Sequence, residues 1–226
     1  MYNETTLGLS KIEKALLIIL SPIIGALLGW FIPSIAEWAI KIPFIPFEGV
    51  FEWIATLESQ WVSVIAAVLG MLAGVFFVFY AFSESLKVTI TDEQLKLEFK
   101  EKATTLHKSE ISAIYLEKKE LVILSLNGNE RFRVPFDAKR DAVSGAFEKH
   151  RYPWKDKDPF ENQYQRWIAD HPDFPAHVNA LISARERALK NEESEEAQVL
   201  RKDLASQGIV VRDKDTRQYV RIVKER

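Results

Sequence analysis

Residues 60–83 read QWVSVIAAVLGMLAGVFFVFYAFS, an apolar run without one charged side chain. A second run of this kind covers residues 15–36 and reads ALLIILSPIIGALLGWFIPSIA. The hydrocarbon core of a membrane is about 30 Å thick, and a helix needs about 18–20 apolar residues to cross it. Each run is longer than that. A cleaved signal peptide explains the first run poorly, because Trp30 and Phe31 stand where small residues would precede a cleavage site. The two runs therefore predict a pair of transmembrane helices.

Outside these runs the chain is highly charged. Most of its 30 basic and 32 acidic side chains lie beyond residue 82, and the formal net charge is -2. This balance excludes a nucleic-acid binder that works through a strong basic field. The 226 residues include no cysteine, which excludes a disulfide framework, a thiolate zinc site, an iron–sulfur cluster and a cysteine nucleophile.

The flanks of the apolar runs predict the orientation of the chain. Lys11 and Lys14 precede the first run, the segment between the runs is acidic, and a segment rich in Lys and Arg follows the second run. Because positive flanks stay in the cytoplasm, we expect a multi-pass plasma-membrane protein with both termini cytoplasmic. Residues 33–60 would lie outside, where Pro43, Pro46 and several aromatic residues predict a partly helical stretch on the lipid interface.

Small residues recur every four positions in both runs. That spacing is about one helical turn, so each set forms a smooth strip that lets helices approach closely. We expect the strips to pack the two spans of one chain together, and packing between two chains in a homodimer is the alternative. Neither span contains an Asp, Glu, Lys, Arg or His residue, which argues against a transporter or an ion path. The small residues are Ser21, Gly25 and Gly29 in the first span and Ala66, Gly70 and Gly74 in the second.

Residues 83–152 change to the alternation that is typical of half-buried strands. Asn127-Gly128 lies between two of these patterns and is a strong hairpin signal. A helix pattern follows over residues 138–150. Strands in a meander followed by one helix predict a small barrel with the helix over an open end. The strand patterns cover residues 86–90, 95–99, 111–116, 121–126 and 130–134.

This order of elements resembles the bacterial pleckstrin-homology-like (PH-like) domains, many of which follow a pair of transmembrane helices. In eukaryotic relatives, basic residues around the first strand–strand loop bind lipid headgroups. In this sequence, that first loop holds Asp92 and Glu93 and no basic residue. The resemblance therefore implies the fold and does not extend to headgroup binding.

The rest of the chain predicts a linker and a small helical module. Residues 153–177 are rich in Pro, Asp and aromatic residues and are typical of a linker, with one short helix over residues 162–169. Beyond it, residues 178–226 predict an antiparallel helical hairpin followed by a short β-hairpin. Gly208 is placed to end the second helix, because glycine accepts the left-handed conformation at that position.

Part of this module resembles the end of cysteinyl-tRNA synthetase, where that family binds the anticodon. No synthetase catalytic domain precedes it, and the cysteines for that family's zinc are absent. The resemblance implies three base-reading positions, which hold Leu189, Gln198 and Asp213 in this chain. An arginine and one aspartate of the family are therefore replaced, which removes one donor and one acceptor. The likeness covers residues 178–221 and rests on Leu181-Ile182, Arg185, Ala188, Leu200-Arg201, Leu204 and the stretch 208–213.

The whole arrangement is similar to the YqeB family of bacterial membrane proteins, which combines two spans, a PH-like domain and a synthetase-tail-like end. It implies an α+β membrane protein with a transmembrane hairpin over residues 1–82, a PH-like domain over 83–152, a linker over 153–177 and the module over 178–226. The likeness is carried by Asp158-Pro159-Phe160, Arg166-Trp167, Leu181, Arg185 and Arg217-Gln218-Tyr219.

The sequence predicts no catalytic centre, metal site or cofactor. The 4 histidines have no partners at metal-ligand spacing, and the nucleophile-elbow, Walker and dinucleotide-binding motifs are absent. We therefore expect a membrane-anchored, non-enzymatic adaptor whose cytosolic modules bind a protein partner. A membrane-tethered RNA or tRNA binder that uses the C-terminal module is the alternative. The candidate binding residues are Arg185, Arg201, Asp213, Arg217 and Tyr219.

Overall fold

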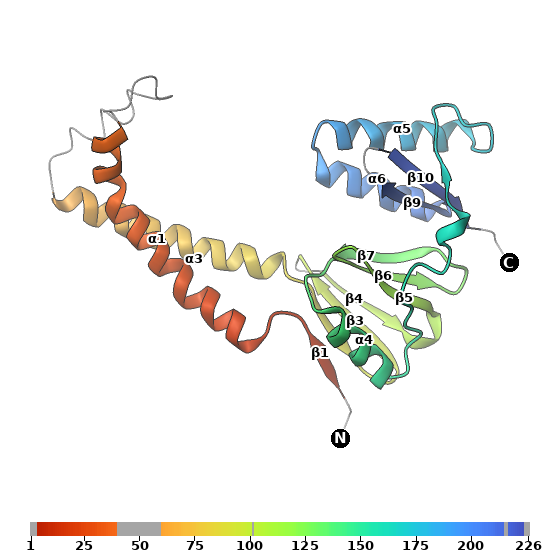
Figure 1. The fold of residues 1–226 in the computed structure, drawn as a ribbon, viewed down its shortest axis with the longest axis horizontal. Coiled ribbons are helices and arrows are strands. Elements are labelled where there is room, and N and C mark those ends of the chain that lie inside the picture. Colours follow the sequence, from red (N-terminus) through yellow and green to blue (C-terminus); the bar gives the residue numbers. More distant parts are fainter. Residues whose placement is uncertain (1–3, 40–59, 101, 215–216, 224–226) are drawn as a thin grey trace. The chain divides into compact units, whose positions relative to one another are not determined.

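The computed structural model describes residues 4–39, 60–100, 102–214 and 217–223 (Figure 1). The chain divides into two compact units, which are described separately. One unit comprises Gly8–Lys87 and Glu98–Lys102 and is dominated by two long helices. The other comprises Met1–Leu7, Val88–Leu97 and Ala103–Arg226 and holds most of the strands and the shorter helices.

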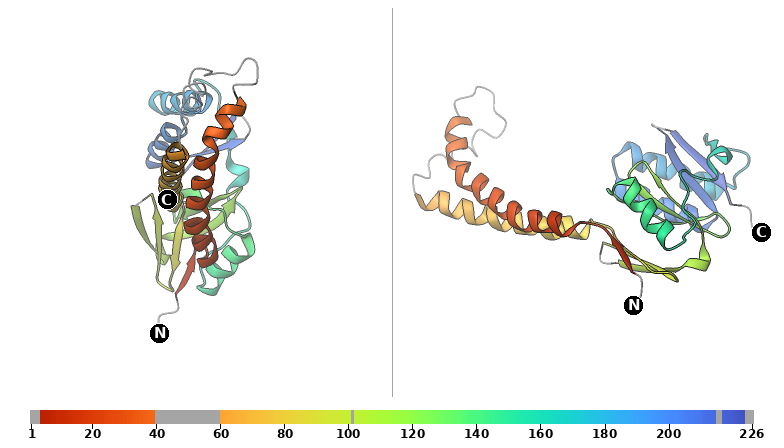
Figure 2. Two further views of the ribbon diagram at one scale, coloured as in Figure 1. Left: turned by 90° about the vertical axis from the view of Figure 1, so that its left-hand side faces the viewer. Right: turned by 60° about the horizontal axis from the view of Figure 1, so that its bottom comes forward.

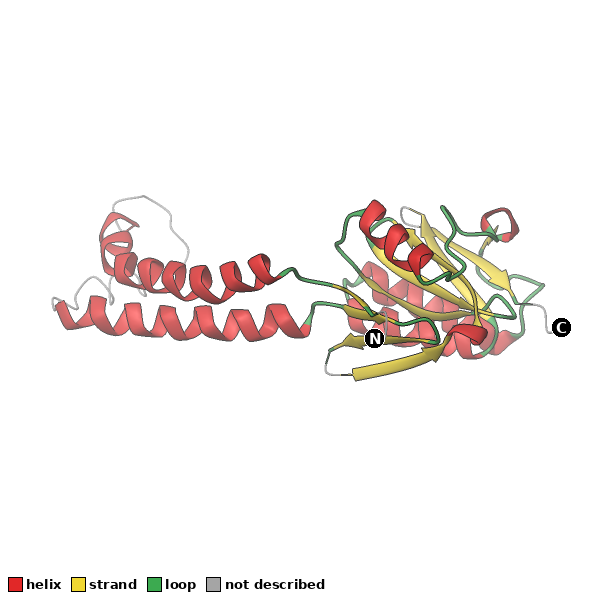
Figure 3. Cartoon of the chain, turned by 90° about the horizontal axis from the view of Figure 1, so that it is seen from below, coloured by secondary structure: helices red, strands yellow, loops and turns green. Residues whose placement is uncertain are grey.

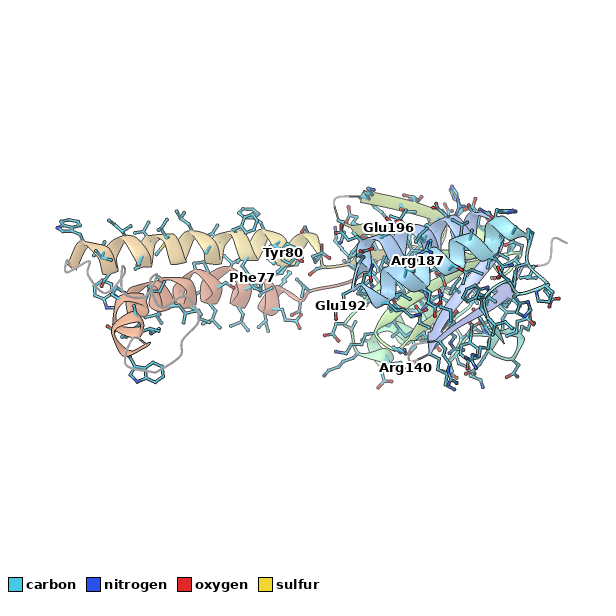
Figure 4. The ribbon with its side chains drawn as sticks, turned by 90° about the horizontal axis from the view of Figure 1, so that it is seen from above. Phe77, Tyr80, Arg140, Arg187, Glu192 and Glu196 are labelled. Carbon is cyan, nitrogen blue, oxygen red and sulfur yellow. The ribbon has the colours of Figure 1, made fainter. Side chains whose placement is uncertain are left out.

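The two long helices are α1 (Lys11–Ala39) and α3 (Gln60–Ser83), which lie side by side. Both are long and apolar enough to cross a membrane. Their large apolar side chains point outward, as Figure 4 shows along α3 near Phe77 and Tyr80. An apolar surface of this kind is stable when lipid rather than water surrounds it. The interfacial stretch expected over residues 33–60 falls mostly on residues 40–59, which lie outside the described residues.

Small residues lie where α1 and α3 approach each other. A Cβ added to Gly25 would overlap the carbonyl group of Gly70, and one added to Gly29 would overlap the carbonyl group of Ala66. A Cβ on Gly74 would likewise meet the backbone of Ser21. The strips of small residues therefore face each other within one chain, and they allow the two backbones to touch.

A strand-rich domain, defined here as β1–β7 with α4, contains two sheets (Figure 3). The order β1-β2-β3-β4 forms the first sheet and β5-β6-β7 the second, so the described strands make two open sheets rather than the closed barrel expected from the sequence. Alternating residues of β2 and β3 are buried, as the sequence pattern predicts. The elements are β1 (Thr5–Leu7), β2 (Lys87–Ile90), β3 (Gln94–Phe99), β4 (Lys102–His107), β5 (Ile111–Glu117), β6 (Glu120–Ser125), β7 (Glu130–Pro135) and α4 (Arg140–Lys149).

Strand β1 is a finding that the sequence pattern did not predict. It pairs antiparallel with β2, with Thr5 opposite Ile90 and Leu7 opposite Val88. The domain therefore begins before the first long helix, and the segment that joins its first two strands is the helical hairpin itself. The loop at Asp92 and Glu93 then joins the second and third strands and is not the first strand–strand loop.

His150 ties β1 to the end of α4. Its imidazole is buried and forms hydrogen bonds at both nitrogens, to the Thr5 hydroxyl through Nε2 at 2.8 Å and to the Asp92 carboxylate through Nδ1 at 2.7 Å. A buried ring that has both nitrogens partnered favours a single placement of β1, because loss of either partner would leave a buried polar atom unsatisfied.

We expect Thr5→Val to weaken this attachment. The valine keeps the shape and strand preference of threonine and removes the hydroxyl, which should lower the free energy of unfolding by about 1–3 kcal/mol. Thr6→Val is the matched control, because Thr6 lies in the same strand and is exposed. Hydrogen exchange should show faster opening of the β1–β2 pairing in Thr5→Val alone. Equal exchange in both variants would contradict the role assigned to His150.

The C-terminal module, defined here as β8–β10 with α5 and α6, forms the last part of the chain. Its sheet has the order β8-β10-β9, and α5 and α6 lie on one face of it (Figures 1 and 2). The core between helices and sheet includes Ile182, Leu204, Val211 and Val220. The elements are β8 (Gln165–Arg166), α5 (Ala176–Lys190), α6 (Ser194–Ser206), β9 (Ile209–Lys214) and β10 (Arg217–Ile222).

The prediction of a short helix over residues 162–169 is wrong. A single 3₁₀ turn at Glu161–Gln163 is followed by strand β8, whose Arg166 pairs with Tyr219 of β10. Trp167 is buried against α5, where its indole Nε1 donates a hydrogen bond to Asn179 Oδ1 at 2.9 Å. Pairing with a distant strand and burial of one aromatic ring therefore override the local helical spacing.

Candidate functional site

Arg185 lies near the middle of α5 and is almost fully buried. Its guanidinium donates two parallel hydrogen bonds to Asp213 of β9, from Nη1 to Oδ1 and from Nη2 to Oδ2, each at 2.7 Å. Nη1 also donates to Gln218 Oε1 at 2.7 Å, and Gln218 Nε2 in turn donates a hydrogen bond to the Ile182 carbonyl of α5. This bidentate geometry is the strongest form of an arginine–carboxylate pair.

Arg201 of α6 approaches the same aspartate from the other helix. Its Nη2 donates to the Val211 carbonyl at 2.9 Å and lies 3.5 Å from Asp213 Oδ2. Burial lowers the pKa of Arg201, and the nearby Arg133 and Arg185 add to the effect. Burial alone would raise the pKa of Asp213, but the hydrogen bonds and charge of Arg185 hold it below its usual value. Asp213 is therefore ionised and shared by two arginines.

Three of the five candidate binding residues thus come together: Arg185, Arg201 and Asp213. The other two do not join them. Arg217 is exposed at the start of β10, and Tyr219 pairs across the sheet with Arg166 and Arg212. The three residues that meet are already bonded to one another, so they stabilise the contact between the helices and β9.

A second ion cluster faces them from the strand-rich domain. Arg133 of β7 is buried and contacts Glu117 at 2.9 Å, Glu120 at 2.8 Å and Glu130 at 2.8 Å. Burial would lower the pKa of Arg133, but these three carboxylates raise it above the usual value. Arg212 of β9 also pairs with Glu117, so the cluster joins the strand-rich domain to the C-terminal module.

A cavity of about 290 Å³, here called the interface pocket, lies between the two clusters. Leu189, Gln198 and Asp213 all line it. These are the positions that the synthetase resemblance assigns to base reading. They open into a pocket whose opposite wall carries Glu117 and Glu120.

The β6–β7 turn makes further contacts with the C-terminal module. Arg221 donates a hydrogen bond from Nη2 to the Gly128 carbonyl at 2.6 Å, and its guanidinium lies 4.3 Å from the centre of the Phe160 ring. Asn129 Nδ2 donates to the Ala205 carbonyl at 2.7 Å. Gly128 has φ +81, and a Cβ there would meet the Phe160 ring at 2.9 Å. Glycine is required at this contact for conformation and for space.

The sequence analysis missed Arg133 and its three glutamates, and it also missed Gln218. Charges on alternate strand residues are normal for a solvated face, so only the register of β6 with β7 reveals that Glu120 and Arg133 are neighbours. Among the residues that the structure describes, no three His, Asp or Glu side chains gather in a way that suits a metal ion.

Comparisons with known proteins agree with this architecture. Residues 5–155 match the family model described as a YqeB-like bacterial PH domain, so the match begins at the first residue of β1. Residues 171–221 match the model of the cysteinyl-tRNA ligase anticodon binding domain. No solved structure matches the chain. The chain is also similar to the "Uncharacterized protein YqeB" of Bacillus subtilis (strain 168), with 40% identity over 220 residues that cover 97% of this chain and 92% of the relative. The chain therefore belongs to the YqeB family.

Proposed function

We propose that this protein is a membrane-anchored, non-enzymatic adaptor. Two spans hold it in the plasma membrane, and the strand-rich domain and C-terminal module meet a protein partner in the cytoplasm. One observation carries the proposal: the arginines and the aspartate of the C-terminal module bond to one another, and the positions expected to read bases open onto two glutamates. The polar residues of this module therefore support a structural role within the cytosolic part of the proposed adaptor.

RNA binding is the second candidate, because the C-terminal module matches an anticodon-binding family. The geometry does not favour it. Both carboxylate oxygens of Asp213 accept hydrogen bonds from Arg185, so this carboxylate is held by the fold rather than presented to a base edge. A phosphate backbone that approached the pocket would also meet Glu117 and Glu120. Repulsion of phosphate by carboxylates opposes the main attraction in nucleic-acid binding.

The pairing of β1 with β2 supports the proposed topology. β1 ends four residues before α1 begins, and β2 begins soon after α3 ends. Because the two strands form one sheet, the chain must leave and re-enter the membrane on the same side. Lys11 and Lys14 favour the cytoplasm as this side, because positively charged flanks of a span tend to stay there.

Labelling of single cysteines should report this topology cleanly, because the chain has no natural cysteine. Ser34→Cys, near the far end of α1, should react with an impermeant thiol reagent on intact cells. Ser206→Cys, which is exposed on α6, should react only after the cells are opened. The reverse pattern would contradict a cytoplasmic location of the termini.

The adaptor and RNA proposals can be separated in living cells. A photo-crosslinking residue in place of Val199, which is 51% exposed on α6, should give a protein adduct that resists ribonuclease. Placing the same residue at Leu204, which is fully buried, controls for random capture. An adduct that ribonuclease removes, together with RNA recovered after ultraviolet crosslinking of the parent chain, would favour the RNA binder instead.

A further inference from the structure

The sheet of the C-terminal module has one face covered by α5 and α6, and the opposite face, here called the outer face, carries mostly basic side chains. Gln218 and Val220 of β10 lie on the helix side, because they contact α5 and the core beneath it. Alternate residues of a strand point to opposite faces, and residues paired across antiparallel strands share a face. The outer face therefore carries Arg217, Tyr219 and Arg221 of β10, with Arg166 of β8 and Arg212 and Lys214 of β9.

Part of the outer face is already occupied by other segments of the chain. Arg221 is buried, and its guanidinium lies against the Phe160 ring. Arg212 pairs with Glu117 of β5 and lies 3.7 Å from Glu161. These two arginines therefore serve the contact with the strand-rich domain and are not available to a partner.

The other cations of the outer face are exposed, and among the described residues no carboxylate lies within ion-pair distance of them. The Asp213 side chain does not neutralise them, because Arg185 holds it on the helix side. In the sequence one more carboxylate, that of Asp215, stands in the turn after β9, outside the described residues. Positive charge thus exceeds negative charge at this end of the face. The cations are Arg166, Lys214 and Arg217.

Tyr219 gives this basic surface an aromatic centre. It is half-buried and lies directly opposite Arg166 on one side and Arg212 on the other. Tyrosine and arginine are among the residue types that contribute most to binding at protein interfaces. Exposed arginines suit carboxylates, which they bind through two parallel hydrogen bonds, and the tyrosine ring suits the apolar part of a side chain.

We propose that the outer face, at Arg166, Lys214, Arg217 and Tyr219, is the docking surface for an acidic segment of the protein partner. This inference rests on the proposed adaptor function and names the chemistry of the partner. The argument is charge complementarity, since the cations have no described carboxylate to neutralise them and a row of Asp or Glu side chains supplies it.

RNA fits this surface less well. Single-stranded RNA is held by a series of exposed rings on which successive bases stack. The Tyr164 ring, on the same side of the sheet, already contacts the guanidinium groups of Arg212 and Arg221. Among the described residues of the outer face, this leaves Tyr219 as the ring open to a base. An acidic peptide needs cations more than rings and is therefore favoured.

A fluorescently labelled octaglutamate peptide is the probe for this surface. The purified full chain, held in uncharged detergent micelles, should raise the fluorescence anisotropy of the peptide. The binding should weaken as the salt concentration rises, because exposed charges are screened. Octauridylate, an RNA with the same number of units, should bind more weakly in a parallel titration.

Two exposed arginines provide matched variants. Arg217→Glu should weaken octaglutamate binding about tenfold, because a carboxylate replaces a cation of the surface. Arg187→Glu makes the same charge change on α5, in the helix layer (Figure 4), and should leave the affinity unchanged.

The outcomes separate this inference from the adaptor proposal. Absence of octaglutamate binding, or equal losses in the two variants, overturns the docking surface. A ribonuclease-resistant adduct at Val199 would in that case still support an adaptor. Tighter binding of octauridylate that Arg217→Glu abolishes would overturn both proposals.

Discussion

Gly70→Leu is expected to separate α1 from α3. A Cβ at this position already overlaps the carbonyl group of Gly25, so the branched side chain must push the two backbones apart. Overpacking of a tight contact costs about 1–3 kcal/mol, and a backbone clash places this variant at about 3 kcal/mol or more. Thermal unfolding in detergent, followed by circular dichroism, should show the loss of stability.

Ala73→Leu is the control for Gly70→Leu. Ala73 lies in the same helix but is exposed, so its substitution adds apolar surface without touching α1. The control should unfold at the midpoint of the parent chain, and hydrogen exchange in α1 should accelerate only in Gly70→Leu. Parent-like stability of Gly70→Leu would show that the strips of small residues are not the contact between the spans.

Asp213→Asn should cause the second large loss of folding stability. The substitution keeps the shape of the side chain and removes the charge that Arg185 and Arg201 share. Removing one partner of a buried ion pair costs about 3–5 kcal/mol, and the partial exposure of Asp213 places the loss at about 3 kcal/mol. Asp203→Asn, at an exposed position of α6, should cost almost nothing.

The stabilisation of the fold by Asp213 should depend on pH, and it should be smaller in acid than near neutrality. Its pKa is lower in the folded chain than the usual value near 4, so its ion pairs stabilise the fold above that pH. The stabilisation is lost as the pH falls through the folded-state pKa. Chemical unfolding at a series of pH values should therefore show a gap between parent and Asp213→Asn that is constant near neutrality and narrows in acid. A gap that persists unchanged at low pH would contradict the charge-based explanation.

The two long helices and most strands could be predicted because their patterns are long. The run at residues 60–83 coincides with α3, and the alternation at Leu95 and Leu97 coincides with β3. β1 could not be predicted because three residues are too few to show the alternation of a strand. β4 could not be predicted because only Leu106 of its six residues is buried, which leaves no alternation to detect.

The candidate site was predictable only on the side where a family resemblance existed. Arg185, Arg201 and Asp213 were named from the synthetase likeness, and they do meet. That likeness carries no information about the strand-rich domain, so Lys118 and Arg133 could not be assigned to the same pocket. Their proximity arises from contacts between segments far apart in sequence, such as Asn129 with Ala205.

The order of synthesis gives the β1–β2 pairing a further consequence. β1 leaves the ribosome first, but its partner strand becomes available only after both long helices have been made. A chain that inserted one helix alone would hold these strands on opposite sides of the bilayer, with the edge of β2 open to aggregation. In the proposed topology, β1 and β2 cannot pair when only one of the two helices is inserted, so this sheet distinguishes a half-inserted chain from one with both helices in the bilayer.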